Sequence, residues 1–239
     1  MRIGIFGDSY TIFNQHNNDH LGLSWVEHLS KIHDVVNFGV PGSSFRWCYE
    51  LFLKHKLEFD FCIVVVPTPT RVYIKALENL PNAPPGHFFA DPLFRDRFKQ
   101  FTSDPTVLKI LDSVDVWYEN WRDHCFENHL HNLMVRDVLS NDNVLVIPGF
   151  PESVEGYGKP YQNLTDIQYW ELAQADPTFD YYHIQCKRKC HLTEENNLVL
   201  FSLIKRAMNN KEKILNLDIK HFKKPAKSID YYADPGYAE

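Results

Sequence analysis

The first ten residues hold the feature that most restricts what this chain can fold into. An apolar run of about five residues ends abruptly in Gly7-Asp8-Ser9. A short apolar run of this kind is typical of a buried strand, and the glycine that follows it indicates a tight turn. The pattern places the Ser9 hydroxyl at the carboxyl end of a strand, where open α/β sheets bind their ligands.

Further strands are predicted at 34–38, 59–66 and 143–147, with helical patterns between them. Ser24 and Glu27 have the spacing of a capping box, which marks the start of one of these helices. Because strands and helices alternate, the expected product is a parallel sheet with helices on both faces. We therefore predict a three-layer α/β/α sandwich with a flavodoxin-like parallel sheet.

A chain of 239 residues suits one domain, which we place at 1–209. Within it, 72–102 reads as an insertion rich in proline and aromatic residues. The helical pattern at 104–139 suits either one long helix or two shorter ones. Residues 151–182 are expected to be rich in loops. Residues 210–239 are expected to form a polar tail that packs on the domain or on a neighbour.

Composition excludes several classes of partner. The net charge is −6 and no long basic block is present, so we expect no nucleic-acid binding. No apolar stretch approaches ~20 residues and no signal peptide is visible, so we expect no membrane association and a cytoplasmic protein with reduced cysteines. The long helical segment and the tail are the candidate surfaces for a homo-oligomer or for association with a larger particle.

Polar and glycine-rich segments follow three predicted strands, at 7–9, 37–42 and 67–71. In a parallel sheet these segments lie along one edge. A fourth, at 189–193, precedes a final helix that opens at Thr193. A serine at such an edge becomes a nucleophile when a base and an oxyanion hole lie beside it. The convergence of these segments predicts a site that can be searched for both.

These segments resemble the conserved blocks of the SGNH (GDSL-type) hydrolases. Gly7-Asp8-Ser9 matches the first block, Asn37 to Gly42 matches the Asn-x-x-x-x-Gly second block, and His191 stands just ahead of the last helix as in the last block. The resemblance covers the first ~70 residues and roughly 180–208. It implies that Ser9 is the nucleophile and His191 the base. It also implies that the amides of Ser9 and Gly42 hold the oxyanion.

Other residues of these blocks have supporting roles. We expect Asp8 to shape the turn and Asn37 to satisfy backbone groups near the site. The family's third block supplies an asparagine that donates to the oxyanion, but here the third strand leads into Pro67-Thr68-Pro69-Thr70-Arg71. The Thr68 hydroxyl or the Arg71 charge could take that place. Loss of one such donor typically costs ~10²–10³ in rate.

The acid that orients the base is also altered. The family pattern is Asp-x-x-His, but Arg188 stands three residues before His191. Asp180 and His183 have the family spacing, although His183 lacks the position at a helix start. We therefore hold His191 as the base, oriented by Asp180 or by a backbone carbonyl, and keep His183 as the alternative base. The acid mainly fixes the histidine tautomer, so a dyad without it is chemically workable.

Two further interpretations concern the same residues. His183, Cys186, Cys190 and His191 have a spacing that suits zinc, but three basic residues between the cysteines oppose a dication. We expect no metal and no organic cofactor. The expected function is a serine esterase that hydrolyses a carboxylic ester through an acyl-enzyme, with O-acetyl groups on a carbohydrate as one candidate substrate. The alternatives are a degenerate domain kept as a binding or structural module, and an acyltransferase.

Overall fold

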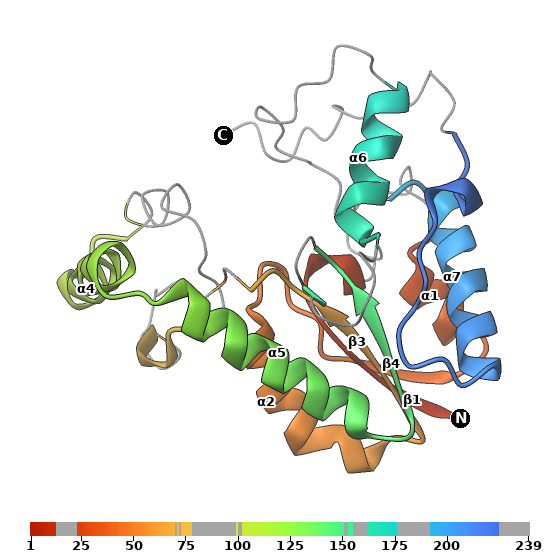
Figure 1. Cartoon of the computed structure of the whole chain (residues 1–239), viewed down its shortest axis with the longest axis horizontal. Helices are drawn as coiled ribbons and strands as arrows, with labels where there is room; N and C mark the ends of the chain where they lie inside the picture. The colour runs from red at the N-terminus through yellow and green to blue at the C-terminus, as the bar shows by residue number, and fades with distance from the viewer. Residues whose placement is uncertain are drawn as a thin grey trace.

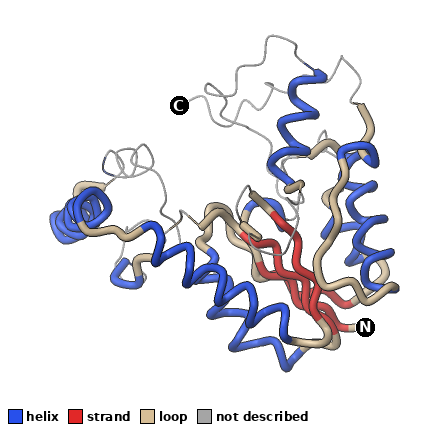
Figure 2. The backbone as a smooth tube through the Cα atoms, in the orientation of Figure 1, coloured by secondary structure: helices blue, strands red, loops and turns tan. Residues whose placement is uncertain are grey.

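The computed structural model describes residues 1–12, 23–69, 71, 73–77, 99, 102–150, 153–154, 162–175 and 192–224. These residues form an α/β protein whose four strands make one parallel sheet flanked by helices (Figures 1 and 2). The strands are β1 (Arg2–Phe6), β2 (Asp34–Asn37), β3 (Phe61–Val66) and β4 (Val144–Pro148), in the order β2-β1-β3-β4. The sequence prediction of a parallel sheet flanked by helices is confirmed.

The sheet forms because its two central strands are apolar on both faces. In β3 the side chains from Cys62 to Val66 are at most 4% exposed. Such near-continuous apolar runs are typical of strands in parallel sheets covered on both sides. The register pairs Ile5 of β1 with Ile63 of β3, and Val64 of β3 with Val146 of β4. Alternate residues of β1, β3 and β4 then enter different core clusters.

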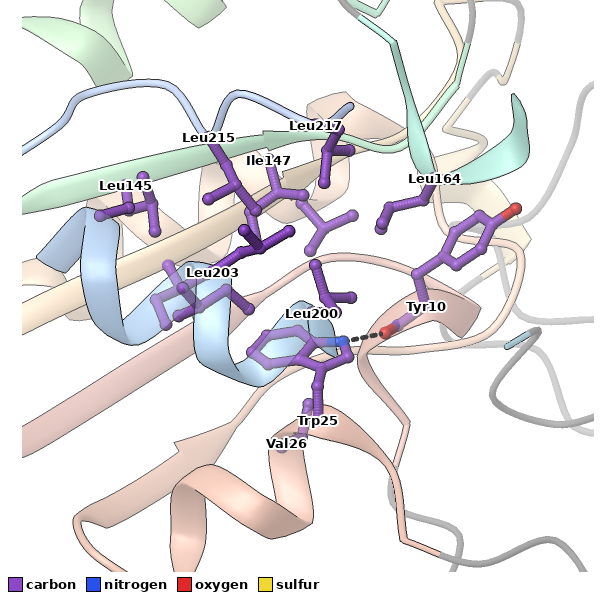
Figure 3. Packing of buried hydrophobic residues seen from close by; sticks show 14 of the residues in the cluster. Tyr10, Trp25, Val26, Leu145, Ile147, Leu164, Leu200, Leu203, Leu215 and Leu217 are labelled. Atoms are coloured by element: carbon purple, nitrogen blue, oxygen red, sulfur yellow. Dashed lines mark hydrogen bonds between the residues drawn. The ribbon is translucent and has the colours of Figure 1, made fainter. Parts of the chain in front are cut away.

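Helices cover both faces of the sheet (Figure 2). On one face α1 (Trp25–Ser30) and α7 (Glu194–Asn209) pack together over the cluster drawn in Figure 3. On the other face lie α2 (Phe45–His55) and α5 (His124–Ser140). The remaining helices among the described residues are α4 (Pro105–Asn120), α6 (Leu164–Ala175) and the short 3₁₀ helices η1 (Ser9–Thr11), η2 (Lys56–Glu58), η3 (Lys75–Leu77) and η5 (Ile219–His221).

Helix starts follow the capping residues of the sequence. Ser24 and Glu27 form the predicted capping box of α1. Thr193 caps α7, as the final helical pattern indicated. The long pattern at 104–139 forms two helices, because Asp123 accepts a hydrogen bond from Phe126 and starts a new helix after α4 has ended. Of the two arrangements left open by the sequence, the structure has the broken one.

The prediction of a loop-rich 151–182 is wrong where α6 lies. Leu164 and Ile167 of this helix are fully buried, but so is the charged Glu171. The apolar residues of α6 therefore do not mark a single helical face, and the periodicity that reveals other helices is missing. Of the insertion expected at 72–102, the structure describes only 73–77, 99 and 102.

The segment expected to be a polar tail contributes to the core in its described part. Leu215, Leu217 and Phe222 are buried with the residues of α1 and α7. Ile214 forms a parallel bridge with Val146, at the edge of β4 away from β3. The segment therefore packs on the domain, while 225–239 lies outside the described residues. No helix in the described part of the chain is long and apolar enough to cross a membrane.

Candidate functional site

The turn after β1 presents Ser9 at the carboxyl edge of the sheet. Ser9 is the first residue of η1, and the Asp8 side chain caps this short helix by accepting a hydrogen bond from the Tyr10 amide at 3.2 Å. The carbonyl of Asp8 accepts two more, from the Thr11 amide at 3.0 Å and the Thr11 hydroxyl at 2.7 Å. Asp8, Tyr10 and Thr11 are buried, whereas Ser9 is partly exposed. The turn is thus anchored on either side of a serine that reaches the surface.

The loop after β2 is connected to this turn by hydrogen bonds of Asn37. Asn37 donates from Nδ2 to the Thr11 carbonyl at 2.6 Å, and its Oδ1 accepts the Gly39 amide at 2.8 Å. A Cβ atom at Gly39 would lie only 1.7 Å from the Thr11 hydroxyl oxygen, so this close approach requires glycine. Asn37 therefore joins the second loop to the Ser9 turn through both ends of its amide.

Gly42 lies further along the same loop and is partly exposed. Its φ of 73° lies in the left-handed region that side chains rarely adopt, which accounts for glycine here. The loop is held near β1 by the Val40 amide and the Ser43 hydroxyl, which both donate to the Gly7 carbonyl, at 3.1 and 3.0 Å. Hydrogen bonds thus connect the loop that carries Gly42 to the turn that carries Ser9.

Arg71 ties the third segment to the first two. Its Nη1 donates to Asp8 Oδ2 at 2.5 Å and to the Ser43 carbonyl at 3.1 Å. The Asp8 side chain is fully buried and that of Arg71 is 15% exposed, so the ion pair is largely removed from water. The guanidinium also lies 4.6 Å from the centre of the Phe150 ring, at the end of β4. One arginine therefore links the ends of β1, β3 and β4 with the loop after β2.

Thr68 follows β3 by two residues and is partly exposed. Its carbonyl accepts the Arg71 amide at 3.4 Å. In the order β2-β1-β3-β4 the chain reverses direction across the sheet between β1 and β3, and this switch point is where open α/β sheets have their ligand crevice. Ser9 and Thr68 stand at the ends of the two strands that flank it.

The candidate bases lie outside the described residues. His191, His183 and Asp180 all fall within 176–191, and so do the cysteines of the zinc interpretation. The described chain resumes at Leu192, which is 2% exposed and belongs to the same core cluster as Tyr10. These two residues directly follow His191 and Ser9 in the sequence.

Two side chains connect the backbone at Leu192 with the backbone at Tyr10. Asn197 donates from Nδ2 to the Leu192 carbonyl at 3.0 Å, and its Oδ1 accepts the Trp25 amide at 3.1 Å. The Trp25 indole then donates to the Tyr10 carbonyl at 2.7 Å (Figure 3). Both of these residues, Asn197 and Trp25, are at most 1% exposed. A short chain of buried hydrogen bonds therefore couples the start of α7 to the turn that carries Ser9.

Sequence reasoning missed a buried polar cluster beside this connection. Glu171 of α6 is fully buried, and each of its carboxylate oxygens accepts the Thr193 amide at 3.1 Å. The Thr193 hydroxyl and the Asn196 side-chain amide donate to the same carboxylate. Glu171 therefore fixes α6 against the first turn of α7. Its partners lie 22 and 25 residues further along the chain, so no local pattern could reveal it.

Cysteine is excluded as the nucleophile at the described part of this edge. Cys48 lies 3.2 Å from the Ser43 hydroxyl, but its burial raises the pKa of the thiol to about 12. Cys62 lies near the start of β3, at the opposite edge of the sheet, and burial also raises the pKa of its thiol to about 12. Both thiols are therefore protonated at neutral pH, and the thiolate is the nucleophilic form. Within the described ranges, no group of three or more His, Cys, Asp or Glu side chains could hold a metal ion.

A pocket of about 700 Å³ opens beside Arg71. Its described walls come from the start of α2, from Pro69, Arg71 and 73–76, and from α4 and α5. Apolar side chains dominate the walls, namely Phe45, Ile74, Ile110, Val114, Trp117, Leu130 and Met134. Since Arg71 also binds Asp8, this pocket and the Ser9 turn share one residue.

His131 of α5 forms part of the pocket wall and is 4% exposed. Its Nε2 lies 2.8 Å from the Ser153 carbonyl, so this nitrogen carries the proton and donates. The ring centre is 4.9 Å from that of Phe45. Burial lowers the pKa of His131 below its usual value of 6.5, and the hydrogen bond to Ser153 opposes this only in part. The residue is therefore neutral in the folded protein at neutral pH.

We expect acidification to destabilise the fold through His131. Its pKa is lowered in the folded state, so between that pKa and 6.5 the unfolded chain binds a proton that the folded chain does not. The free energy of unfolding should thus be highest above pH 6.5 and fall as the pH drops through this window. Burial also lowers the pKa of His28 and His33, which adds to the effect.

Urea unfolding at pH 7.5, 6.5 and 5.5 measures this effect in the native protein and in His131→Gln, whose side-chain amide can still donate to Ser153. We expect the loss of stability on acidification to be smaller in the variant. Equal losses in both proteins would show that His131 does not contribute.

Comparison with known proteins gives no matching family model, no matching curated relative and no matching solved structure. The functional argument therefore depends on this chain's own residues and their geometry.

Proposed function

We propose that this protein is a serine esterase of the SGNH (GDSL) type, with Ser9 as the nucleophile and His191 as the general base. The observation that carries the proposal is the buried connection from Leu192 through Asn197 and Trp25 to Tyr10. It fixes the residue after His191 relative to the residue after Ser9, which are 182 positions apart in the sequence. A base and a nucleophile must be held in such a fixed relation to act together.

The proposed fold is the flavodoxin-like α/β/α sandwich of that family. The order β2-β1-β3-β4 is the first part of the flavodoxin-like order, and the bridge from Ile214 to Val146 occupies the place of a fifth strand beside β4. Helices on both faces of the sheet agree with the two outer layers. Ser9 then stands at the switch point, where this architecture has its ligand crevice.

In the proposed reaction, Ser9 Oγ attacks the carbonyl carbon of an ester while His191 accepts the hydroxyl proton. The negative charge that develops on the carbonyl oxygen is stabilised by the backbone amides of Ser9 and Gly42 and by the Thr68 hydroxyl. Collapse of this intermediate breaks the bond to the alcohol, which leaves with the proton from His191. Water, deprotonated by His191, then attacks the acyl-enzyme and releases the carboxylic acid and the free Ser9 hydroxyl.

Arg71 has a positioning role in this proposal. One of its nitrogens is already shared between Asp8 and the Ser43 carbonyl, so the guanidinium orients the Ser9 turn and the loop that carries Gly42. Thr68 is then the side chain that replaces the asparagine of the third block. A hydroxyl that substitutes imperfectly for that donor is expected to lower the rate by up to ~10²–10³. The substrate class in this proposal is a small-molecule or carbohydrate ester, such as an O-acetylated sugar.

Hydrolysis of p-nitrophenyl acetate and butyrate by two matched histidine variants tests the base. His191→Ala should lower kcat/KM by about 10³-fold or more, while His183→Ala should retain most of the activity. A far-UV circular dichroism spectrum of each variant checks that it is folded. If His183→Ala alone were inactive, the base would be His183. If neither substitution changed the rate, the serine–histidine mechanism would be wrong.

The second candidate function is a catalytically inactive binding or structural module, which the missing asparagine after β3 favours. Fluorophosphonates separate the two candidates, because they modify an activated serine whatever ester the enzyme prefers. Stoichiometric modification of Ser9 supports the hydrolase. No modification in a protein that is also inactive on both esters supports the module. An acyltransferase would share the Ser9 modification and differ only in using an alcohol in place of water.

A further inference from the structure

The pocket of about 700 Å³ has the size and composition of a small-molecule site. Ligand pockets commonly span ~300–1,000 Å³ and combine apolar walls with a few polar groups. Here the apolar walls come from α2, η3, α4 and α5, so four separate elements enclose one space. Trp117 is 36% exposed and Leu130 is 41% exposed, which leaves large apolar surfaces open to a ligand.

The charged side chains of the pocket are nearly all positive. Among the described residues that line it, Glu127 is the single carboxylate and four are basic, namely Arg46, Arg71, Lys75 and Lys109. Glu127 is already paired with Arg122, whose side chain is 2% exposed and which does not line the pocket. Arg46 is paired with Glu50 at 3.2 Å. The charge that remains for a ligand is therefore positive.

Three of the four cations retain donors in the described part of the chain. Lys75 and Lys109 form no ion pair among the described residues, and both are exposed. Both hydrogen bonds of the Arg71 guanidinium to described residues come from Nη1, so Nη2 and Nε have no acceptor there. Cations beside an apolar cavity favour a ligand that brings both a negative group and an apolar body.

We propose that this pocket binds an anionic amphiphile, meaning a molecule with an apolar body of several carbon atoms and a carboxylate, sulfonate or phosphate group. The apolar body lies against Ile110, Val114 and Trp117, and the anion is held by Lys75, Lys109 and the outer nitrogens of Arg71. This binding site does not depend on any step of the proposed hydrolysis. An extension of this proposal does rest on the proposed function. Because Arg71 belongs both to the pocket and to the Ser9 site, the ester substrate would itself carry an anionic group that Arg71 binds.

A pair of fluorescent probes tests the proposal directly. 8-Anilinonaphthalene-1-sulfonate carries an anion on an apolar body, and N-phenyl-1-naphthylamine has the same body without the sulfonate. Each is titrated into the full chain carrying Ser9→Ala, so that turnover plays no part. The variants added to this background are Lys75→Gln with Lys109→Gln, Val114→Trp to fill the pocket, and Lys205→Gln as a control on α7, on the opposite face of the sheet.

We expect the variant with Lys75→Gln and Lys109→Gln to bind the sulfonate about tenfold more weakly, because two charge-assisted contacts are lost together. Binding of the neutral probe should stay unchanged in that variant. Val114→Trp should weaken binding of both probes, and Lys205→Gln neither. Sulfonate binding should also weaken as ionic strength rises.

If the sulfonate bound the variant with both lysines replaced as tightly as it binds the parent, the proposed recognition of an anion would be overturned. Unchanged binding of both probes to a folded Val114→Trp protein would place them outside the pocket, on the exposed apolar residues of α4 and α5. Because Lys75 and Lys109 are exposed, their substitution leaves the core intact, and the test stands even where Val114→Trp does not fold. Failure of the esterase assays alone would leave the binding result as it is.

Discussion

Replacing Ser9 with alanine is expected to abolish ester hydrolysis, with kcat/KM on p-nitrophenyl butyrate reduced by about 10³–10⁶-fold. In the proposed mechanism the hydroxyl oxygen forms the covalent bond of the acyl-enzyme, and no other group of the turn can take its place. Asp8 and Thr11 are buried and engaged in the hydrogen bonds of the turn. The residual rate would come from the amides of the oxyanion hole acting on water.

The fold should tolerate this change. The Asp8 side chain and carbonyl hold the turn by accepting three hydrogen bonds, and these do not depend on the Ser9 hydroxyl, which is partly exposed. The free energy of unfolding is therefore expected to fall by about 1 kcal/mol or less. Urea unfolding measures this, and a native-like value would show that lost activity reflects lost chemistry.

Ser202→Ala is the matched control for Ser9→Ala. Ser202 is exposed on α7 and its hydroxyl donates to the Leu198 carbonyl at 2.9 Å, within its own helix. This variant should hydrolyse the ester at the full rate. Full activity in Ser9→Ala, with the same mass increase from a fluorophosphonate as in the parent, would remove Ser9 from the mechanism.

Local patterns in the sequence predicted the parts of the fold that have a local cause. The four strands follow from short apolar runs, and the starts of α1 and α7 from capping residues with their own hydrogen-bond partners three residues away. The position of α6 could not be predicted in this way, because Gln168 and Glu171 are buried beside its apolar residues. Glu171 is stabilised by partners on another helix, so its burial is a tertiary effect.

For the candidate site too, the sequence indicated the features with a local cause and missed the contacts between distant segments. The sequence indicated that Ser9, Asn37 and Gly42 follow neighbouring strands, and the structure brings their loops into one bonded unit. It did not indicate that Arg71 would pair with Asp8, because that contact depends on how the loop after β3 folds back across 63 residues of sequence. The connection through Trp25 and Asn197 spans 172 residues and was invisible for the same reason.

The pair formed by Asp8 and Arg71 is expected to be the most sensitive point of the site to substitution. Arg71→Ala removes the cation from a fully buried carboxylate, and an uncompensated buried charge typically costs about 3–5 kcal/mol in the free energy of unfolding. Asp8→Asn keeps the shape of the side chain and leaves Arg71 charged but 15% exposed beside the pocket. We therefore expect a smaller loss for it, about 1–3 kcal/mol.

A double-mutant cycle separates the ion pair from the packing around it. The combined Asp8→Asn, Arg71→Ala protein should be more stable than the sum of the two single losses predicts, by about 2 kcal/mol or more, because the buried unpaired charge is absent. Urea unfolding of the four proteins measures this coupling. Additive losses would show that the two side chains contribute independently, and Arg71 would then stabilise the end of β4 through Phe150 rather than the Ser9 turn through Asp8. A large coupling, together with lost ester hydrolysis in Arg71→Ala and recovery in Arg71→Lys, would establish that the charge at Arg71 positions the turn that carries the nucleophile.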